Sequence, residues 1–286
     1  MGGTAVSTAC WLLVEQAGSW QPNAFAGADL DPAVRTLLID AAVQARARPL
    51  LVRRPGRPDA GSGAERFWAV VDTRPGGRDT RGTFSDDRDL LTAAAALERP
   101  TRPEAAGRAA TEPLLLVCTH GRRDVCCAVR GRPVAAALAE RWPDQTWECT
   151  HVGGDRFAAN LVVVPSATYY GALDPDSAVR VVQDHLDGRV DPTHLRGFGV
   201  AVPAAQAAVI EVHRRFGPFA AGEVEPETVE RLEDRSWRIG LAAVAPAPPR
   251  LVATVVAEVA PPELLTCHAL RSSPATVHRV RSLEPL

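Results

Sequence analysis

Residues 114–127 read LLLVCTHGRRDVCC, and residues 149–160 read CTHVGGDRFAAN. Four of the six cysteines of the chain lie in these two stretches. The first stretch opens with an apolar run that is typical of a buried strand and places Cys118 at its carboxyl end. Because α/β sheets bind their ligands at such strand ends, the two stretches predict an α/β fold with a site at this edge of the sheet.

The donors in these stretches predict a metal centre. A glycine lets the loop between Cys118 and Cys127 turn back, so two thiolates can face one point. After a helix and a second strand come His151 and Asp155, separated by a segment with two glycines that lets the backbone approach closely. Two sulfurs, an imidazole and a carboxylate together form a candidate donor set for a metal.

The pattern resembles the sucrase/ferredoxin-like family. Its parts are C-x-H-G-x-R-D-x-x-C over 118–127, H-x-G-G-D-R-F-A-x-N over 151–160 and YYG at 169–171. The resemblance implies a thioredoxin-like domain that holds a 2Fe-2S cluster. It also implies Cys118, Cys127 and His151 as ligands, whereas relatives place a second histidine where this chain has Asp155.

The fourth ligand therefore stays open between three residues. Asp155 occupies the position of the second histidine in the resemblance. Cys149 and Cys126 are chemically better ligands for iron, since thiolate is the usual cluster ligand. Cys149 precedes His151 by two residues on a strand, so both side chains can project from the same face, whereas Cys126 is expected to point away from Cys127.

His120 is a further cofactor-binding candidate because it lies two residues past Cys118. It either hydrogen-bonds the cluster or orients a ligand, which would tune the reduction potential, or it is an ordinary loop histidine in water. Cys10 and Cys267 have no donor neighbours in the sequence and are expected to be core or surface thiols.

The composition is that of an ordinary globular protein. The chain has 286 residues, of which 46% are hydrophobic and 23% charged, with a net charge of −2. This small net charge gives no strong electrostatic attraction for nucleic acid or a membrane surface. No apolar run approaches the roughly 20 residues of a spanning helix, so we expect a cytoplasmic protein.

The hydrophobic periodicity and the positions of glycine and proline predict three regions. These are an N-terminal α/β region over 1–108, the thioredoxin-like ferredoxin domain over 109–218, and a β-rich C-terminal segment over 219–286 that packs on the body. Residues 99–113 have the composition of a linker. The expected helices are 31–46, 89–98, 132–142, 174–187 and 203–216. The expected strands are 10–15, 50–55, 67–72, 114–117, 145–148, 160–165, 229–241, 250–259 and 263–270.

The leading functional hypothesis is a 2Fe-2S electron-transfer protein, an electron carrier or redox partner and not a stand-alone enzyme. Alternatives are a zinc site with the same donors and a thiol-disulfide oxidoreductase. The absence of a C-x-x-C motif weighs against the oxidoreductase. A scaffold that has lost its cluster is a fourth possibility.

The expected partner is a redox protein, and an acidic one is the specific candidate. Arg122, Arg130 and Arg132 would form an exposed basic rim for it, although a solvated surface is the default interpretation of such residues. The chain has no glycine-rich phosphate loop for a nicotinamide, flavin or ATP. The sequence does not indicate the oligomeric state.

Overall fold

The computed structural model describes residues 1–56, 64–74, 77–99 and 112–286. Two compact units make up the chain, and neither is continuous in sequence. The cysteine unit contains residues 8–152 and 161–167. The C-terminal unit contains residues 1–7, 153–160 and 168–286.

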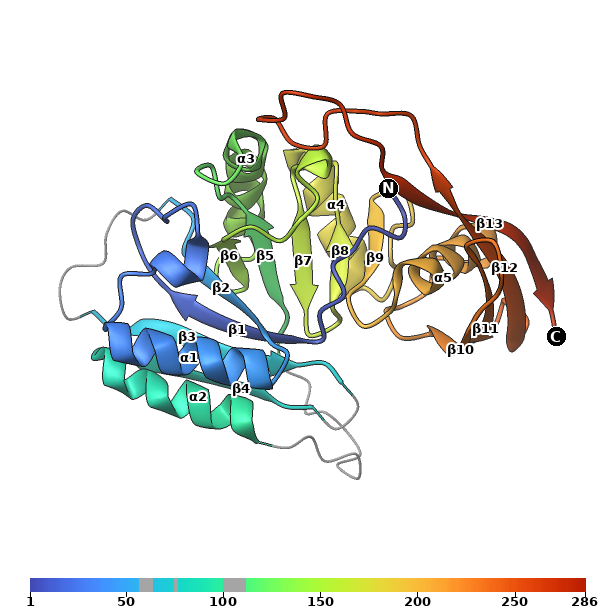
Figure 1. The fold of residues 1–286 in the computed structure, drawn as a ribbon. Helices are drawn as coiled ribbons and strands as arrows, with labels where there is room; N and C mark the ends of the chain where they lie inside the picture. Colours follow the sequence, from blue (N-terminus) through green and yellow to red (C-terminus); the bar gives the residue numbers. More distant parts are fainter. Residues whose placement is uncertain (57–63, 75–76, 100–111) are drawn as a thin grey trace. The chain divides into compact units, whose positions relative to one another are not determined.

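The cysteine unit is built on a mixed sheet in which the strands run in the order β4-β3-β1-β2-β6-β5-β7 (Figure 1). β1 is parallel to β2 and β5 is parallel to β6, while the other neighbours in this series are antiparallel. The strands are β1 Cys10–Glu15, β2 Arg48–Arg53, β3 Arg66–Asp72, β4 Asp79–Phe84, β5 Leu114–Cys118, β6 Thr146–Cys149 and β7 Leu161–Val164.

Two helices, α1 Pro32–Gln44 and α2 Leu91–Glu98, pack side by side against the N-terminal part of this sheet (Figure 1). The α1 helix begins as predicted, because the Asp31 carboxylate accepts from the backbone N–H groups of Ala33 and Val34. Such a cap stabilises a helix by about 1 kcal/mol. Leu38 of α1 is fully buried in the core shared with Trp20, Phe25 and Leu90.

The α3 helix, Val125–Arg141, connects β5 to the parallel strand β6. The sequence predicted its start at residue 132, but it begins seven residues earlier, where Asp124 caps the N–H of Cys126 at 2.9 Å. Pro133 lies inside the helix and had suggested a later start. Cys127 is consequently a helical residue in the first turn and not a loop residue.

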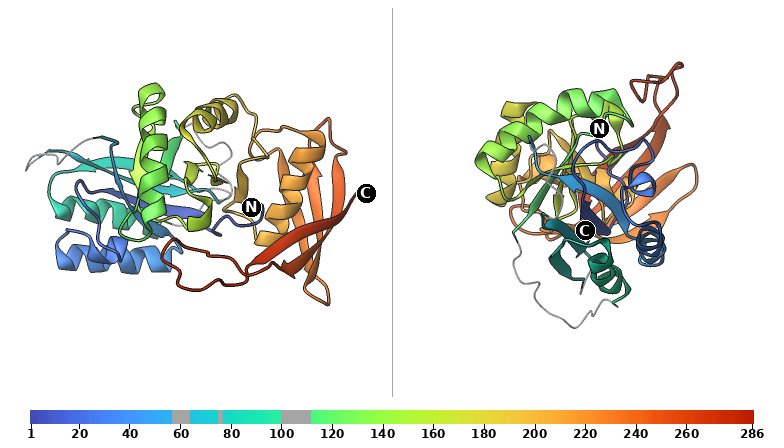
Figure 2. Two further views of the ribbon diagram at one scale, coloured as in Figure 1. Left: turned by 90° about the horizontal axis from the view of Figure 1, so that it is seen from above. Right: turned by 90° about the vertical axis from the view of Figure 1, so that its left-hand side faces the viewer.

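The C-terminal unit carries two helices, α4 Pro175–Leu186 and α5 Pro203–Phe216, and the antiparallel strand pair β8 Thr168–Tyr170 and β9 Leu195–Phe198. Its four-stranded antiparallel sheet has the order β10-β11-β12-β13, and α5 packs on it (Figure 2). These strands are β10 Val224–Arg231, β11 Ser236–Ala243, β12 Arg250–Val259 and β13 Thr276–Pro285.

Several predicted strands of this unit were wrong. A turn divides the expected strand 229–241 between β10 and β11. The expected strand 263–270 contributes only an isolated bridge between Glu263 and Ser273, and β13 lies further along the chain. β13 has 10 residues, but most of them are exposed or half-exposed and its apolar residues do not alternate, so the sequence pattern did not reveal it.

The α/β class that the sequence predicted is confirmed, including the β-rich C-terminal segment. The pairing of β2 with β6 joins the N-terminal strands to the strand that carries Cys149. The predicted linker and the boundary at 108/109 fall largely on 100–111, outside the described residues. The division at 1–108, 109–218 and 219–286 stays a prediction.

Candidate metal centre

Three of the predicted ligands meet at the carboxyl ends of β5 and β6. Cys118 is the last residue of β5, Cys127 lies in the first turn of α3, and His151 follows β6 by two residues. The two sulfur atoms and one ring nitrogen of His151 all lie within 4.8 Å of one another. Two thiols and an imidazole at this spacing form a donor set that can hold a metal ion.

The α3 helix is positioned to face this point. Cys127 is its third residue, so its sulfur lies near the unsatisfied N–H groups and the positive end of the helix dipole. Thiolates are stabilised at such helix N-termini. Gly131 allows close packing, because a Cβ there would lie 2.2 Å from the Cys118 carbonyl oxygen. The helix therefore rests directly on the backbone of the ligand strand.

The hydrogen bonds at the site favour the thiolate form of Cys118. Hydrogen bonds from the Cys127 thiol and from His151, together with the His120 backbone N–H, hold the pKa of the Cys118 thiol well below its usual value, against the opposing effect of burial. Nδ1 of His151 lies 3.9 Å from the Cys127 sulfur. A charged, soft ligand is thus available inside a site whose two sulfurs are buried.

Cys149 is the register partner of Cys118 across the parallel strands β5 and β6. Its sulfur is not part of the group within 4.8 Å. Burial, and next the neighbouring negative charge of Cys118, raise the pKa of the Cys149 thiol well above its usual value. Cys126, the second residue of α3, is half-buried and is also outside that group.

His120 is buried, and its orientation is defined by one bond. Nε2 lies 2.9 Å from the carbonyl oxygen of Gln21, which only accepts, so Nε2 carries the proton. The edge of the ring contacts Trp20, and Nδ1 has no hydrogen-bond partner among the described residues. Burial lowers the pKa of His120, so the ring is neutral and Nδ1 is an acceptor.

His151 is half-buried, and it lines a cavity of about 400 Å³ within the cysteine unit together with His120, Arg48 and Arg123. The Arg48 guanidinium donates to the His151 carbonyl oxygen at 2.7 Å and fixes the backbone there. This imidazole borders a cavity, whereas both sulfurs of the donor group are buried.

Asp155 begins the short turn η3, Asp155–Phe157, of the C-terminal unit. Its assignment as a metal ligand stays a prediction. Its neighbour Arg156 pairs with Glu263 in the same unit, and Asp124 caps α3.

Arg196 holds the glycine segment that precedes Asp155, and the sequence analysis missed it. It is 1% exposed. Its guanidinium donates to the carbonyl oxygens of Thr4 and Gly153 and to the Asn160 amide oxygen, at 2.6, 2.9 and 2.8 Å. A Cβ on Gly154 would lie 2.3 Å from this guanidinium, which explains the glycine there. No local pattern marks Arg196, because its partners are distant in sequence.

The remaining thiols are not part of the donor group. Cys10 is buried in β1, and burial raises its pKa to about 12. Cys267 is exposed. Among the described helices, none is long and apolar enough to cross a membrane.

Comparison with known families agrees with this geometry. The profile of a family described as sucrase/ferredoxin-like matches residues 1–197. The chain belongs to the sucrase/ferredoxin-like family. The match includes β5, α3, β6 and all three residues of the donor group.

One curated relative is the altered inheritance of mitochondria protein 32 of Meyerozyma guilliermondii, which is 34% identical over 104 residues. The match covers 31% of this chain and 35% of the relative, so the chain spans about a third of the relative's length. No solved structure gave a significant match.

Proposed function

We propose that this protein is an electron carrier that holds one 2Fe-2S cluster. The observation that carries the proposal is the convergence of Cys118, Cys127 and His151 within 4.8 Å at the end of a buried strand. Membership of the sucrase/ferredoxin-like family supports it. The fourth ligand would be Asp155, Cys149 or Cys126.

The residues present fit such a cluster. Thiolates are the usual ligands of iron-sulfur centres, and Cys118 has the low thiol pKa that a thiolate needs. When bound, the cluster would supply reversible one-electron transfer. Histidine in place of thiolate leaves a cluster less negative and raises its reduction potential. The donor set therefore favours a carrier with a higher potential than an all-cysteine ferredoxin.

One side of the centre would be shielded from water, and the other side would border a cavity. Cys118 and Cys127 are each 1% exposed, so the sulfur side excludes water. His151 borders the cavity of about 400 Å³ and would be the side from which electrons enter or leave. The electrons would be exchanged with an acidic partner redox protein in the cytoplasm.

Two other uses of the same donors compete with this proposal. Zinc takes two sulfurs, one nitrogen and a further ligand in a tetrahedral site. Alternatively, the hydrogen bond from the Cys127 thiol to Cys118 places the two sulfurs so that oxidation could join them, as in a thiol-disulfide oxidoreductase.

The deciding experiment is the metal and acid-labile sulfide content of protein purified without oxygen, together with a visible spectrum. We expect about two irons and two sulfides per chain and absorption bands that bleach on reduction. Stoichiometric zinc without colour would overturn electron transfer in favour of a metal-stabilised protein. Metal-free protein with a reducible Cys118–Cys127 disulfide would favour the oxidoreductase.

The ligand assignment is tested by Cys118→Ser and Cys127→Ser. Each variant loses a soft anionic donor, so we expect iron content to fall at least tenfold. Cys267→Ser is the matched control, because that cysteine is exposed and outside the donor group. Full iron content in either buried variant would contradict the assignment.

The fourth ligand is tested by comparing Asp155→Ala with Cys149→Ala. Loss of a ligand would alter the visible and electron paramagnetic resonance spectra of the reduced protein. We expect one variant to change the spectra and the other to keep them. If both variants keep the spectra of the unmodified protein, Cys126→Ala is the next substitution.

A further inference from the structure

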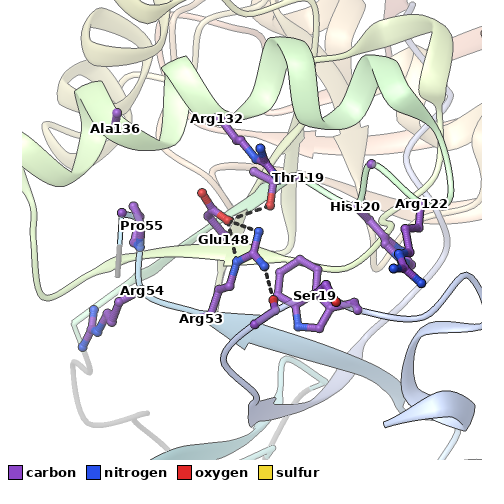
Figure 3. A pocket seen from close by; sticks show the side chains of 14 residues that line it. Ser19, Arg53, Arg54, Pro55, Thr119, His120, Arg122, Arg132, Ala136 and Glu148 are labelled. Carbon is purple, nitrogen blue, oxygen red and sulfur yellow. Dashed lines mark hydrogen bonds and ion pairs between the residues drawn. The ribbon is translucent and has the colours of Figure 1, made fainter. Parts of the chain in front are cut away.

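A second cavity of the cysteine unit is larger than the one beside His151 and lies next to the donor group without containing its ligands. Its volume is about 740 Å³. It is bordered by the loop Thr119–Gly121 that follows Cys118, by α3, and by the ends of β2 and β6 (Figure 3). Volumes of this size are typical of small-molecule sites.

The lining of this cavity is strongly basic. Its charged residues are one glutamate and four arginines, namely Glu148, Arg53, Arg54, Arg122 and Arg132. The glutamate is already bonded within the wall: Arg53 pairs with it at 2.6 Å, and the Thr119 hydroxyl donates to it at 3.0 Å. The buried Glu148–Arg53 pair is therefore neutral overall, and the positive excess belongs to the other three arginines.

Two of these arginines form no ion pair within the described parts of the chain. Arg132 projects from α3 toward Thr119 (Figure 3). Arg122 makes a single long bond, 3.3 Å, to the neutral side chain of Gln21. Both are exposed, so each guanidinium is free to turn its planar face of N–H donors to a ligand.

Arg54 is held more rigidly at the edge of the same cavity. Its guanidinium lies 3.6 Å from the Trp147 ring and donates to the carbonyl oxygens of Pro143 and Asp144. Of the three arginines that the sequence predicted as a basic rim, Arg122 and Arg132 line this cavity, whereas Arg130 does not. Arg122 and Arg132 therefore lie at the opening of this cavity.

We infer that this cavity binds a small anion that carries phosphate groups or more than one carboxylate. Guanidinium groups match the planar geometry of carboxylate and phosphate oxygens and bind them with charge-assisted hydrogen bonds. A concave cavity of this size encloses a small molecule, whereas protein docking surfaces are broader. The inference does not depend on which metal the neighbouring donor group holds.

The test is calorimetric titration of the full chain with inorganic pyrophosphate and, separately, with citrate. We expect binding of one molecule per chain that weakens as salt is raised, because exposed charges are screened. Tighter binding of pyrophosphate would identify phosphate as the natural ligand chemistry, and tighter binding of citrate would identify carboxylate.

The double variant Arg122→Gln, Arg132→Gln should weaken binding at least tenfold, since each substitution removes charge-assisted donors. The matched control is Arg180→Gln, an exposed arginine on α4 that is outside the cavity. Circular dichroism of each variant checks the fold, and both substituted positions are exposed.

Three results would overturn the inference. The first is no binding of either probe at low salt. The second is equal binding by the double variant and the unmodified protein, and the third is equal weakening by Arg180→Gln, which would mean a diffuse charge effect. If an acidic peptide such as hexaglutamate binds while neither small anion does, the basic residues serve a protein partner instead.

Discussion

Buried polar side chains near the candidate metal centre differ in their hydrogen bonding from His213, a buried residue of the C-terminal unit. At the ends of β5 and β6 in the cysteine unit, Thr119, His120, Glu148 and Thr150 are all buried and each has a hydrogen-bond partner. In α5 of the C-terminal unit, His213 is buried between Phe198 and Phe219, and neither ring nitrogen has a partner among the described residues.

This difference separates two uses of a buried polar group. A partnered network keeps charges in place beside a site, and its loss is costly because the remaining partner is left uncompensated. An unpartnered ring costs free energy already at neutral pH and makes its unit sensitive to acid. The surroundings of Glu148 should thus be sensitive to substitution and the surroundings of His213 to pH.

The largest effect is expected for Arg53→Met. Arg53 and Glu148 are 16% and 7% exposed, so the substitution leaves a buried carboxylate without its cation. The free energy of unfolding should fall by about 3–5 kcal/mol, measured by urea denaturation. The second substitution Glu148→Gln should recover part of the loss.

The control lies in the C-terminal unit. Arg238 and Glu230 form an ion pair whose side chains are 56% and 58% exposed. Exposed pairs contribute little, so Arg238→Met should cost less than about 1 kcal/mol. Equal losses in Arg53→Met and Arg238→Met would show that burial does not make the Glu148 network sensitive to substitution.

A smaller effect is expected for His213→Leu, and it depends on pH. Burial lowers the pKa of His213 to about 4, although Glu223 opposes this. The folded state therefore binds the proton less readily than the unfolded state, whose histidine has a pKa near 6.5. The stability should fall as pH drops from about 6.5 to about 4, by about 3 kcal/mol from this residue.

Urea unfolding of His213→Leu at several pH values should lack this part of the acid loss. His185, whose pKa burial also lowers to about 4, should still contribute. The exposed His268→Leu is the control and should keep the acid loss of the unmodified protein. The same acid loss in His213→Leu and the unmodified protein would show that His213 is not responsible.

The smallest effect is expected for Gly131→Ala. The added Cβ would lie 2.2 Å from the Cys118 carbonyl oxygen, so α3 must shift away from β5. Overpacking of this kind costs about 1–3 kcal/mol, here reduced because alanine favours a helix over glycine by about 1 kcal/mol. Thermal unfolding measures the change, with Glu140→Ala on the exposed side of α3 as control.

A Gly131→Ala protein as stable as the unmodified one would mean that α3 can adjust freely against β5. Metal content should be measured on the same sample, because Cys127 moves with the helix. Full stability together with lost metal would sharpen the comparison, since it would show that close packing in the cysteine unit serves the donor group.

Much of the fold could be predicted from local pattern. The apolar run at 114–117 became β5, and Asp31 and Asp174 cap α1 and α4 as expected. The errors have local causes too. Pro133 led to a predicted helix start two turns too late, although α3 continues through this proline. The division of 229–241 into two strands depends on a turn that contains no glycine or proline.

The candidate site was predictable in part. The sequence predicted that Cys118, Cys127 and His151 lie close together, because residues that end neighbouring strands meet at one edge of a sheet, and their ligand atoms lie within 4.8 Å of one another. The sequence could not reveal Arg196 or the cavity formed by Arg122 and Arg132. These depend on contacts between residues far apart in the chain, and no spacing rule relates them.

The strand β2 meets β6 through only two register pairs, Val52 with Cys149 and Arg53 with Glu148. Next to them, Thr150 continues the contact, as its N–H donates to Leu51 and its hydroxyl accepts from the Leu51 N–H. The β5–α3–β6 segment closes a much shorter loop, and short loops close sooner during folding. We therefore expect the sulfur and imidazole donors to gather before β2 pairs with β6.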